Sequence, residues 1–171
     1  MDDNQIIEYV TLLGEGATSR FEGCHCVDEI ESLPQTAGHF YVVNTLPLTQ
    51  AKKGIVGHWT LLMKGSSIHD NAEAPLVFFD PLGAPPSSMS LIKKIMNENN
   101  HVLYNNYPLQ SIFADSCGLH ICYVITLYIE GLSMQQILSN CYDIKSLSET
   151  KNDVIVETFL DGLIKDKKEK W

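Results

Sequence analysis

Residues 116–131 read SCGLHICYVITLYIEG, and this is the most apolar segment of the chain. From Ile121 to Ile129 only Thr126 interrupts the run of apolar side chains, which predicts a helix that is buried on all sides. The run is too short to cross a bilayer. Ser116 marks the start of this helix and Gly131 its end. The segment therefore predicts the central helix of a globular core.

The segments on either side of this helix alternate between strand and helix patterns. Residues 14–37 are rich in turn-forming residues and are given no element. Together the patterns predict one α+β domain over residues 1–171, with a central mixed or antiparallel sheet of about four to five strands. The expected strands are 39–44, 55–63, 76–79 and 101–104, and the expected helices are 3–13, 88–98, 133–140 and 151–165, followed by a solvated Lys-rich tail over 165–171.

Composition limits the function further. The 171 residues include 12 basic and 21 acidic side chains, giving a net charge of −9, which argues against non-specific nucleic-acid binding. Eight acids and only Arg20 lie in residues 1–31, so the acidity is concentrated there. Asp2 and Asp3 are unlike the positive start of a signal peptide, and the five cysteines do not form a disulfide pattern. We expect a reducing, intracellular setting without a membrane anchor.

Cys117 is the first candidate for chemistry. It lies at the expected N-terminus of the buried helix, where the helix dipole and free N–H groups favour a thiolate. Gly118 leaves room for a substrate beside it. The competing interpretation is a buried structural cysteine, the commonest fate of a free thiol.

A thiol nucleophile needs a base and a group that orients the base. His58 lies in the expected strand 55–63, and Asp80 ends the next strand, so paired strands would bring the two together. His58 could instead be an ordinary hydrogen-bonded histidine, and Asp80 could simply cap the turn at Pro81. Asp70 and Glu73 are rival carboxylates in an expected loop.

Gln110 could complete such a site. It precedes Cys117 by seven residues in an irregular segment, and its amide could donate to an oxyanion alongside the backbone N–H of Cys117. On its own a loop glutamine is more often a solvated side chain.

Taken together, these motifs resemble the adenovirus-type maturation cysteine proteases, which share the fold of SUMO-type proteases of ubiquitin-like proteins. The resemblance covers about residues 5–130, and the spacing between Gln110 and Cys117 matches the adenoviral type more closely than the SUMO type. Similar small proteases occur in virophages and Polinton-like elements. The motifs are Phe21-Glu22-Gly23, Tyr41–Thr45, Gly57-His58-Trp59, Phe79-Asp80-Pro81-Leu82-Gly83, Gln110 and Cys117-Gly118-Leu119.

The resemblance assigns a role to each of these residues. It implies a cysteine endopeptidase with Cys117 as nucleophile, His58 as base and then acid, and Asp80 as its orienting group. Gln110 would help to form the oxyanion hole, and Trp59 and Gly118 would line the substrate passage. Substrates would be viral capsid or core precursor proteins cut after Gly, in a host cell and inside the virion.

The sequence also differs from this protease family in features that concern partners and cofactors. The acidic charge makes activation by DNA doubtful, and no cysteine lies between Cys26 and Cys117 to bind an activating peptide through a disulfide. No cofactor is expected. Cys24-His25-Cys26 lacks a second ligand pair, so no metal site is expected either.

Two alternatives stay open. An enzyme with the same chemistry could remove ubiquitin-like modifiers from proteins. A protein of this fold could also have lost its chemistry and only bind a partner, although the presence of all four expected catalytic residue types argues against that.

Overall fold

A computed structural model describes residues 1–33, 36–55, 57–65, 75–86, 90–97, 101–144 and 148–169. The strands are β1 (Phe21–Cys26), β2 (Phe40–Asn44), β3 (Trp59–Lys64), β4 (Leu76–Phe79) and β5 (Val102–Tyr104). The helical elements are α1 (Asp3–Leu13), α2 (Glu15–Thr18), η1 (Ile30–Ser32), α3 (Leu48–Ala51), α4 (Ser90–Asn97), α5 (Cys117–Ile129), α6 (Met134–Gln136), the π-helix η3 (Ile137–Cys141) and α7 (Glu149–Glu169).

The five strands form one mixed sheet in the order β1-β2-β3-β4-β5. β2, β3 and β4 pair antiparallel, while β1 and β5 are parallel to their neighbours at the two edges. The prediction of one α+β domain with a sheet of about four to five strands is thus confirmed.

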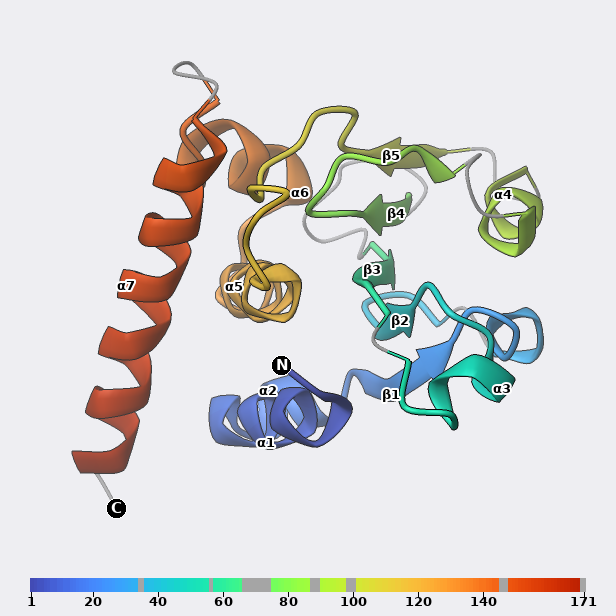
Figure 1. Cartoon of the computed structure of the whole chain (residues 1–171). Helices are drawn as coiled ribbons and strands as arrows, with labels where there is room; N and C mark the ends of the chain where they lie inside the picture. The colour runs from blue at the N-terminus through green and yellow to red at the C-terminus, as the bar shows by residue number, and fades with distance from the viewer. Residues whose placement is uncertain are drawn as a thin grey trace.

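The two faces of the sheet carry separate apolar clusters because strand side chains alternate. Phe40 and Val42 of β2 face the larger cluster, which α1, α5 and α7 cover; Tyr41 and Val43 face the smaller one, which includes residues of α4. Figure 1 shows α5 and α7 on one side of the sheet and α4 on the other. The catalytic candidates lie where α5 begins on the larger side.

The apolar segment quoted above forms α5, the predicted buried helix. Every residue from His120 to Tyr128 is buried, and the helix packs against β3, α1 and α7. The hydroxyl of Thr126 in this helix is 2.7 Å from the Tyr9 hydroxyl of α1 in a buried hydrogen bond. The start of α5 is therefore fixed by a helix packed on all sides.

Two expectations about strands are wrong in part. The turn-rich stretch contains β1, whose strand pattern is broken at Gly23, with φ of 108°, and by a register shift in its pairing with β2. β3 begins at Trp59 and not at residue 55. A Cβ on Gly57 would lie 1.9 Å from Asn44 Oδ1, so the chain before β3 passes across the Asn44 side chain outside the strand ladder.

The last helix is longer than predicted. α7 runs from Glu149 to Glu169 and so includes most of the Lys-rich tail. Lysine and glutamate are good helix formers, and a charged sequence can continue a helix into solvent. Met89, which was expected in the helix over 88–98, and the rival carboxylates Asp70 and Glu73 lie outside the described residues.

The described helices include none that is both long and apolar enough to span a membrane.

Candidate active site

Cys117 is the first residue of α5, with Ser116 as the N-cap. Burial alone would raise the pKa of its thiol, but hydrogen bonds with the His58 side chain and with the backbone N–H groups of Trp59 and Gly118 lower that pKa below its ordinary value. These partners favour the charged form of the sulfur, so the site stabilises a thiolate.

His58 lies one residue before β3 and connects the thiol to Asp80. Its Nε2 is 2.6 Å from Asp80 Oδ1. Burial acts to lower the pKa of His58, but hydrogen bonds and charge interactions with Asp80 and Cys117 outweigh it and raise the pKa to about 9. Because the Asp80 carboxylate accepts from Nε2, Nδ1 is the ring nitrogen left for the thiol. The His58 side chain is 20% exposed, which leaves the ring accessible from solvent.

Asp80 follows β4 and is held by the turn that it starts. Its Oδ1 also accepts from the Leu82 backbone N–H at 2.8 Å, and its side chain is 2% exposed. The turn closes at Gly83, where φ is 71° and a Cβ would lie 2.4 Å from the Tyr107 carbonyl carbon. Only glycine fits that backbone and that approach, so the Asp-Pro-Leu-Gly motif fixes the carboxylate that faces His58.

Asn105 binds the backbone of Asp80 and was not among the residues predicted from the sequence. Its Oδ1 accepts from the Asp80 backbone N–H at 3.0 Å, and its Nδ2 donates to the Asp80 carbonyl at 2.6 Å. A signal was available: Asn105 directly follows β5, which lies parallel to β4 with Tyr104 paired to Phe78. Polar residues after neighbouring parallel strands meet at one edge of the sheet.

Gln110 lies in a segment that is hydrogen-bonded to the turn after β4. The backbone N–H groups of Leu109 and Gln110 both donate to the Pro81 carbonyl, at 2.8 and 3.0 Å. The Gln110 side chain is buried, and its Nε2 donates to the Ala114 carbonyl at 2.5 Å. Gln110 is thus a fixed buried residue and not a solvated one, and its part in an oxyanion hole stays a prediction.

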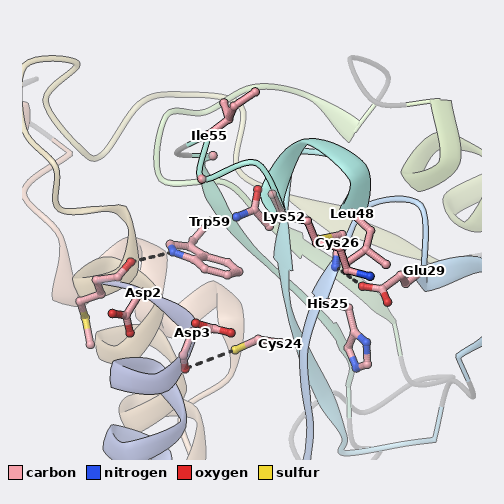
Figure 2. A pocket seen from close by; sticks show the side chains of 15 residues that line it. Asp2, Asp3, Cys24, His25, Cys26, Glu29, Leu48, Lys52, Ile55 and Trp59 are labelled. Carbon is pink, nitrogen blue, oxygen red and sulfur yellow. Dashed lines mark hydrogen bonds between the residues drawn. The ribbon is translucent and has the colours of Figure 1, made fainter.

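A cavity of about 580 Å³ is lined by Trp59 and by residues of β1, of α3 and of the chain start, and none of the four catalytic candidates lies in its wall (Figure 2). Trp59 Nε1 donates to the Met1 carbonyl at 2.9 Å, which holds residues at the start of α1 against the indole. The space that Gly118 leaves is not open: a Cβ there would lie 2.8 Å from Met1 Cβ. The expected substrate-binding roles of Trp59 and Gly118 stay predictions.

The other cysteines differ from Cys117. Burial raises the pKa of Cys24 to about 12, and Cys122 is fully buried with its pKa raised by burial as well. Within the described residues, no group of three or more His, Cys, Asp or Glu side chains is arranged to bind a metal ion. The Cys24-His25-Cys26 motif therefore forms no such group. Cys117 is the cysteine whose pKa is lowered.

No protein-family profile and no curated protein matches this chain. Two structures of the Chlamydia trachomatis effector protein ChlaDUB1 are similar in fold: one has a TM-score of 0.47 at 17% identity, covering 96% of this chain and 80% of that chain. The other has a TM-score of 0.46 at 16% identity, covering 96% and 73%. At these values the likeness identifies no family.

Proposed function

We propose that this protein is a cysteine peptidase. The observation that carries the proposal is the contact between three side chains from separate elements: Cys117 at the start of α5, His58 before β3 and Asp80 after β4. The lowered pKa of the thiol and the raised pKa of the imidazole both favour a thiolate–imidazolium pair. A structural cysteine would have no need of such a pair.

The arrangement supports a two-step hydrolysis. The Cys117 thiolate attacks the scissile carbonyl carbon and a C–S bond forms; the C–N bond then breaks while the proton on His58 passes to the departing amine. In the second step His58 takes a proton from water, the hydroxide attacks the thioester and the C–S bond breaks. Asp80 keeps the ring in the required tautomer and stabilises its charged form.

The developing oxyanion needs donors near the sulfur. The backbone N–H of Cys117 lies at the start of α5, where free N–H groups and the helix dipole favour negative charge. Gln110 Nε2 donates one N–H to Ala114 and has a second one to give. We assign both groups to the oxyanion hole.

Two substrate classes remain, both with a glycine at the cleaved bond. We place removal of ubiquitin-like modifiers first, and processing of capsid or core precursors in a virus-infected cell second. Trp59 in the cavity wall is the proposed contact for the segment before the cleaved bond.

The test uses purified wild type and Cys117→Ala, with Cys141→Ala as matched control. Cys141 is a partly exposed free cysteine outside the catalytic site. The probes are a Leu-Arg-Gly-Gly fluorogenic peptide, ubiquitin and SUMO carrying a C-terminal fluorophore, and a peptide with an internal Gly-Gly site. We expect wild type and Cys141→Ala to cleave at least one probe and Cys117→Ala to cleave none.

The pattern of cleavage decides between the classes. Preference for a folded modifier over its C-terminal peptide supports modifier removal, whereas cleavage of the internal site alone supports precursor processing. The peptidase proposal fails if wild type is as inert as Cys117→Ala on all probes and if Cys117 of wild type is not alkylated. A partner-binding protein is then the better interpretation.

A further inference from the structure

Asp153 lies on α7, far from Cys117 in the sequence, yet its carboxylate reaches the segment before the nucleophile. The residue is 6% exposed. It accepts a hydrogen bond from the Ser116 hydroxyl at 2.6 Å and another from the Ser111 backbone N–H at 3.1 Å. Ser111 directly follows Gln110, and Ser116 directly precedes Cys117. One carboxylate therefore binds both ends of the segment between Gln110 and Cys117.

A third contact lies one turn into α5. His120 Nε2 is 2.9 Å from Asp153 Oδ1, and its Nδ1 is 3.2 Å from the Tyr142 hydroxyl. The ring is fully buried and stacked on Tyr142, with centroids 5.7 Å apart. Burial lowers the pKa of His120 despite the nearby carboxylate, so the ring is neutral and donates one N–H to Asp153. Three donors satisfy the buried carboxylate.

The Ser116 hydroxyl forms an unusual hydrogen bond for a serine at the N-cap of a helix. An N-cap serine ordinarily accepts from a backbone N–H in the first turn, which is worth about 1 kcal/mol to a helix. Ser116 makes no such bond: its φ of −102° and ψ of 4° lie outside the extended region usual for an N-cap, and its hydroxyl donates to Asp153. The first N–H groups of α5 are therefore not taken up by the cap, and the backbone N–H of Gly118 is directed to the Cys117 sulfur.

We propose that Asp153 is a positioning residue for the nucleophile and for the oxyanion donors. It fixes residues 111–116 against α7 and keeps the N-cap hydroxyl away from the start of α5, so that the N–H groups there remain available to substrate. The inference rests on the proposed peptidase function. It adds a residue that touches neither the sulfur nor the substrate, and that acts through Ser111, Ser116 and His120.

Two reactions of Cys117 separate this role from a merely structural one. Alkylation by chloroacetamide needs the thiolate–imidazolium pair but no oxyanion hole, whereas peptide hydrolysis needs both. We expect Asp153→Asn to lower kcat between about tenfold and 100-fold, with a smaller change in KM and an alkylation rate within about twofold of wild type. The matched control is Asp161→Asn, the same change at an exposed position of α7, which should leave both reactions unchanged.

Two results would overturn the proposal. One is a kcat of Asp153→Asn within twofold of wild type. The other is an equal loss of hydrolysis and alkylation, which would indicate general disruption of the fold. If Asp153→Asn does not fold, Ser116→Ala removes one of the three contacts, and the same split between kcat and alkylation is expected, with a smaller loss in kcat.

Amide hydrogen exchange tests the positioning even if wild type cleaves none of the probes. Asp153→Asn turns one carboxylate oxygen into an NH2 group, and the remaining oxygen is expected to stay with Ser116 and His120, the two donors on Oδ1. The Ser111 amide on Oδ2 then loses its acceptor, so exchange over residues 111–117 should accelerate while β2 and β3 keep their protection. Unchanged exchange in this segment would refute the proposal independently of activity. An inactive wild type with the expected exchange would refute the peptidase function alone.

Discussion

Two histidine–carboxylate pairs lie on the same side of the molecule, and they behave in opposite ways. His58 Nε2 is 2.6 Å from Asp80, and His120 Nε2 is 2.9 Å from Asp153. Yet the pKa of His58 is raised to about 9, while that of His120 is lowered. The same two functional groups thus hold a charged ring in one place and a neutral ring in the other.

The difference arises from the surroundings of each pair. The His58 side chain is 20% exposed and its free nitrogen faces a thiol that becomes negative, whereas the His120 side chain is 0% exposed and its free nitrogen faces the neutral Tyr142 hydroxyl. Asp153 also shares its charge with Ser116 and Ser111. A His–Asp contact therefore supports acid–base chemistry only where solvent and a titrating partner reach the second ring nitrogen.

The sharpest test of this comparison is the same substitution in both pairs. We expect His58→Gln to reduce kcat/KM by about 10⁴-fold and to slow alkylation of Cys117, because the thiolate loses its partner. His120→Gln should leave alkylation within a few-fold of wild type and should mainly lower the free energy of unfolding. Equal slowing of alkylation by both variants would break the comparison.

A second prediction concerns pH. The lowered pKa of Cys117 sets the acid limb of activity, and the raised pKa of His58, about 9, sets the alkaline limb. The Cys117 alkylation rate should therefore rise with pH through a thiol pKa below that of a free cysteine, and kcat/KM should fall as His58 loses its proton near pH 9. In Asp80→Asn the alkaline limb should move to lower pH, because the carboxylate no longer raises the His58 pKa. An activity that rises only above the free-thiol pKa of about 8.5 would contradict the ion pair.

A smaller loss of activity is expected when the hydrogen bonds that hold the Asp80 backbone are removed. Asn105→Ala removes two hydrogen bonds from the Asp80 backbone, and we expect kcat/KM to fall about tenfold and the unfolding free energy to fall by about 1–3 kcal/mol. Asn106→Ala is the matched control, since Asn106 is the exposed neighbour. Steady-state kinetics and urea denaturation measure the two effects. Equal behaviour of the two variants would remove Asn105 from the site.

The smallest expected effect lies in stability at acid pH. The folded pKa of His120 is below its unfolded value of about 6.5, so its contribution is complete above pH 6.5 and is lost as the pH falls through the folded pKa. The difference in unfolding free energy between wild type and His120→Gln should therefore shrink below pH 6.5. Denaturation at pH 7.5, 6.5 and 5.5 measures it; a difference that grows on acidification would show that the buried ring is charged.

Much of the fold could be predicted from sequence patterns. The all-round apolar run after Ser116 forms α5, and the runs before Pro47 and Asp80 form β2 and β4. Each is a short segment in which consecutive apolar residues indicate that the element is buried. β1 escaped prediction because Gly23 and the register shift break its pattern, and β3 was placed too early because Gly57 fits close to Asn44, a contact that no local pattern contains.

The chain by itself determined the kinds of residue at the site: a thiol at a helix start, a histidine beside a strand and a carboxylate held by an Asp-Pro-Leu-Gly turn. Local spacing specifies each of these, because a helix start and a tight turn are built from adjacent residues. Only the tertiary structure decided which histidine meets which carboxylate. Before folding, His58 and His120 are equivalent imidazoles with ordinary pKa values. Burial and contacts between residues 22 and 33 positions apart then charge one ring and keep the other neutral.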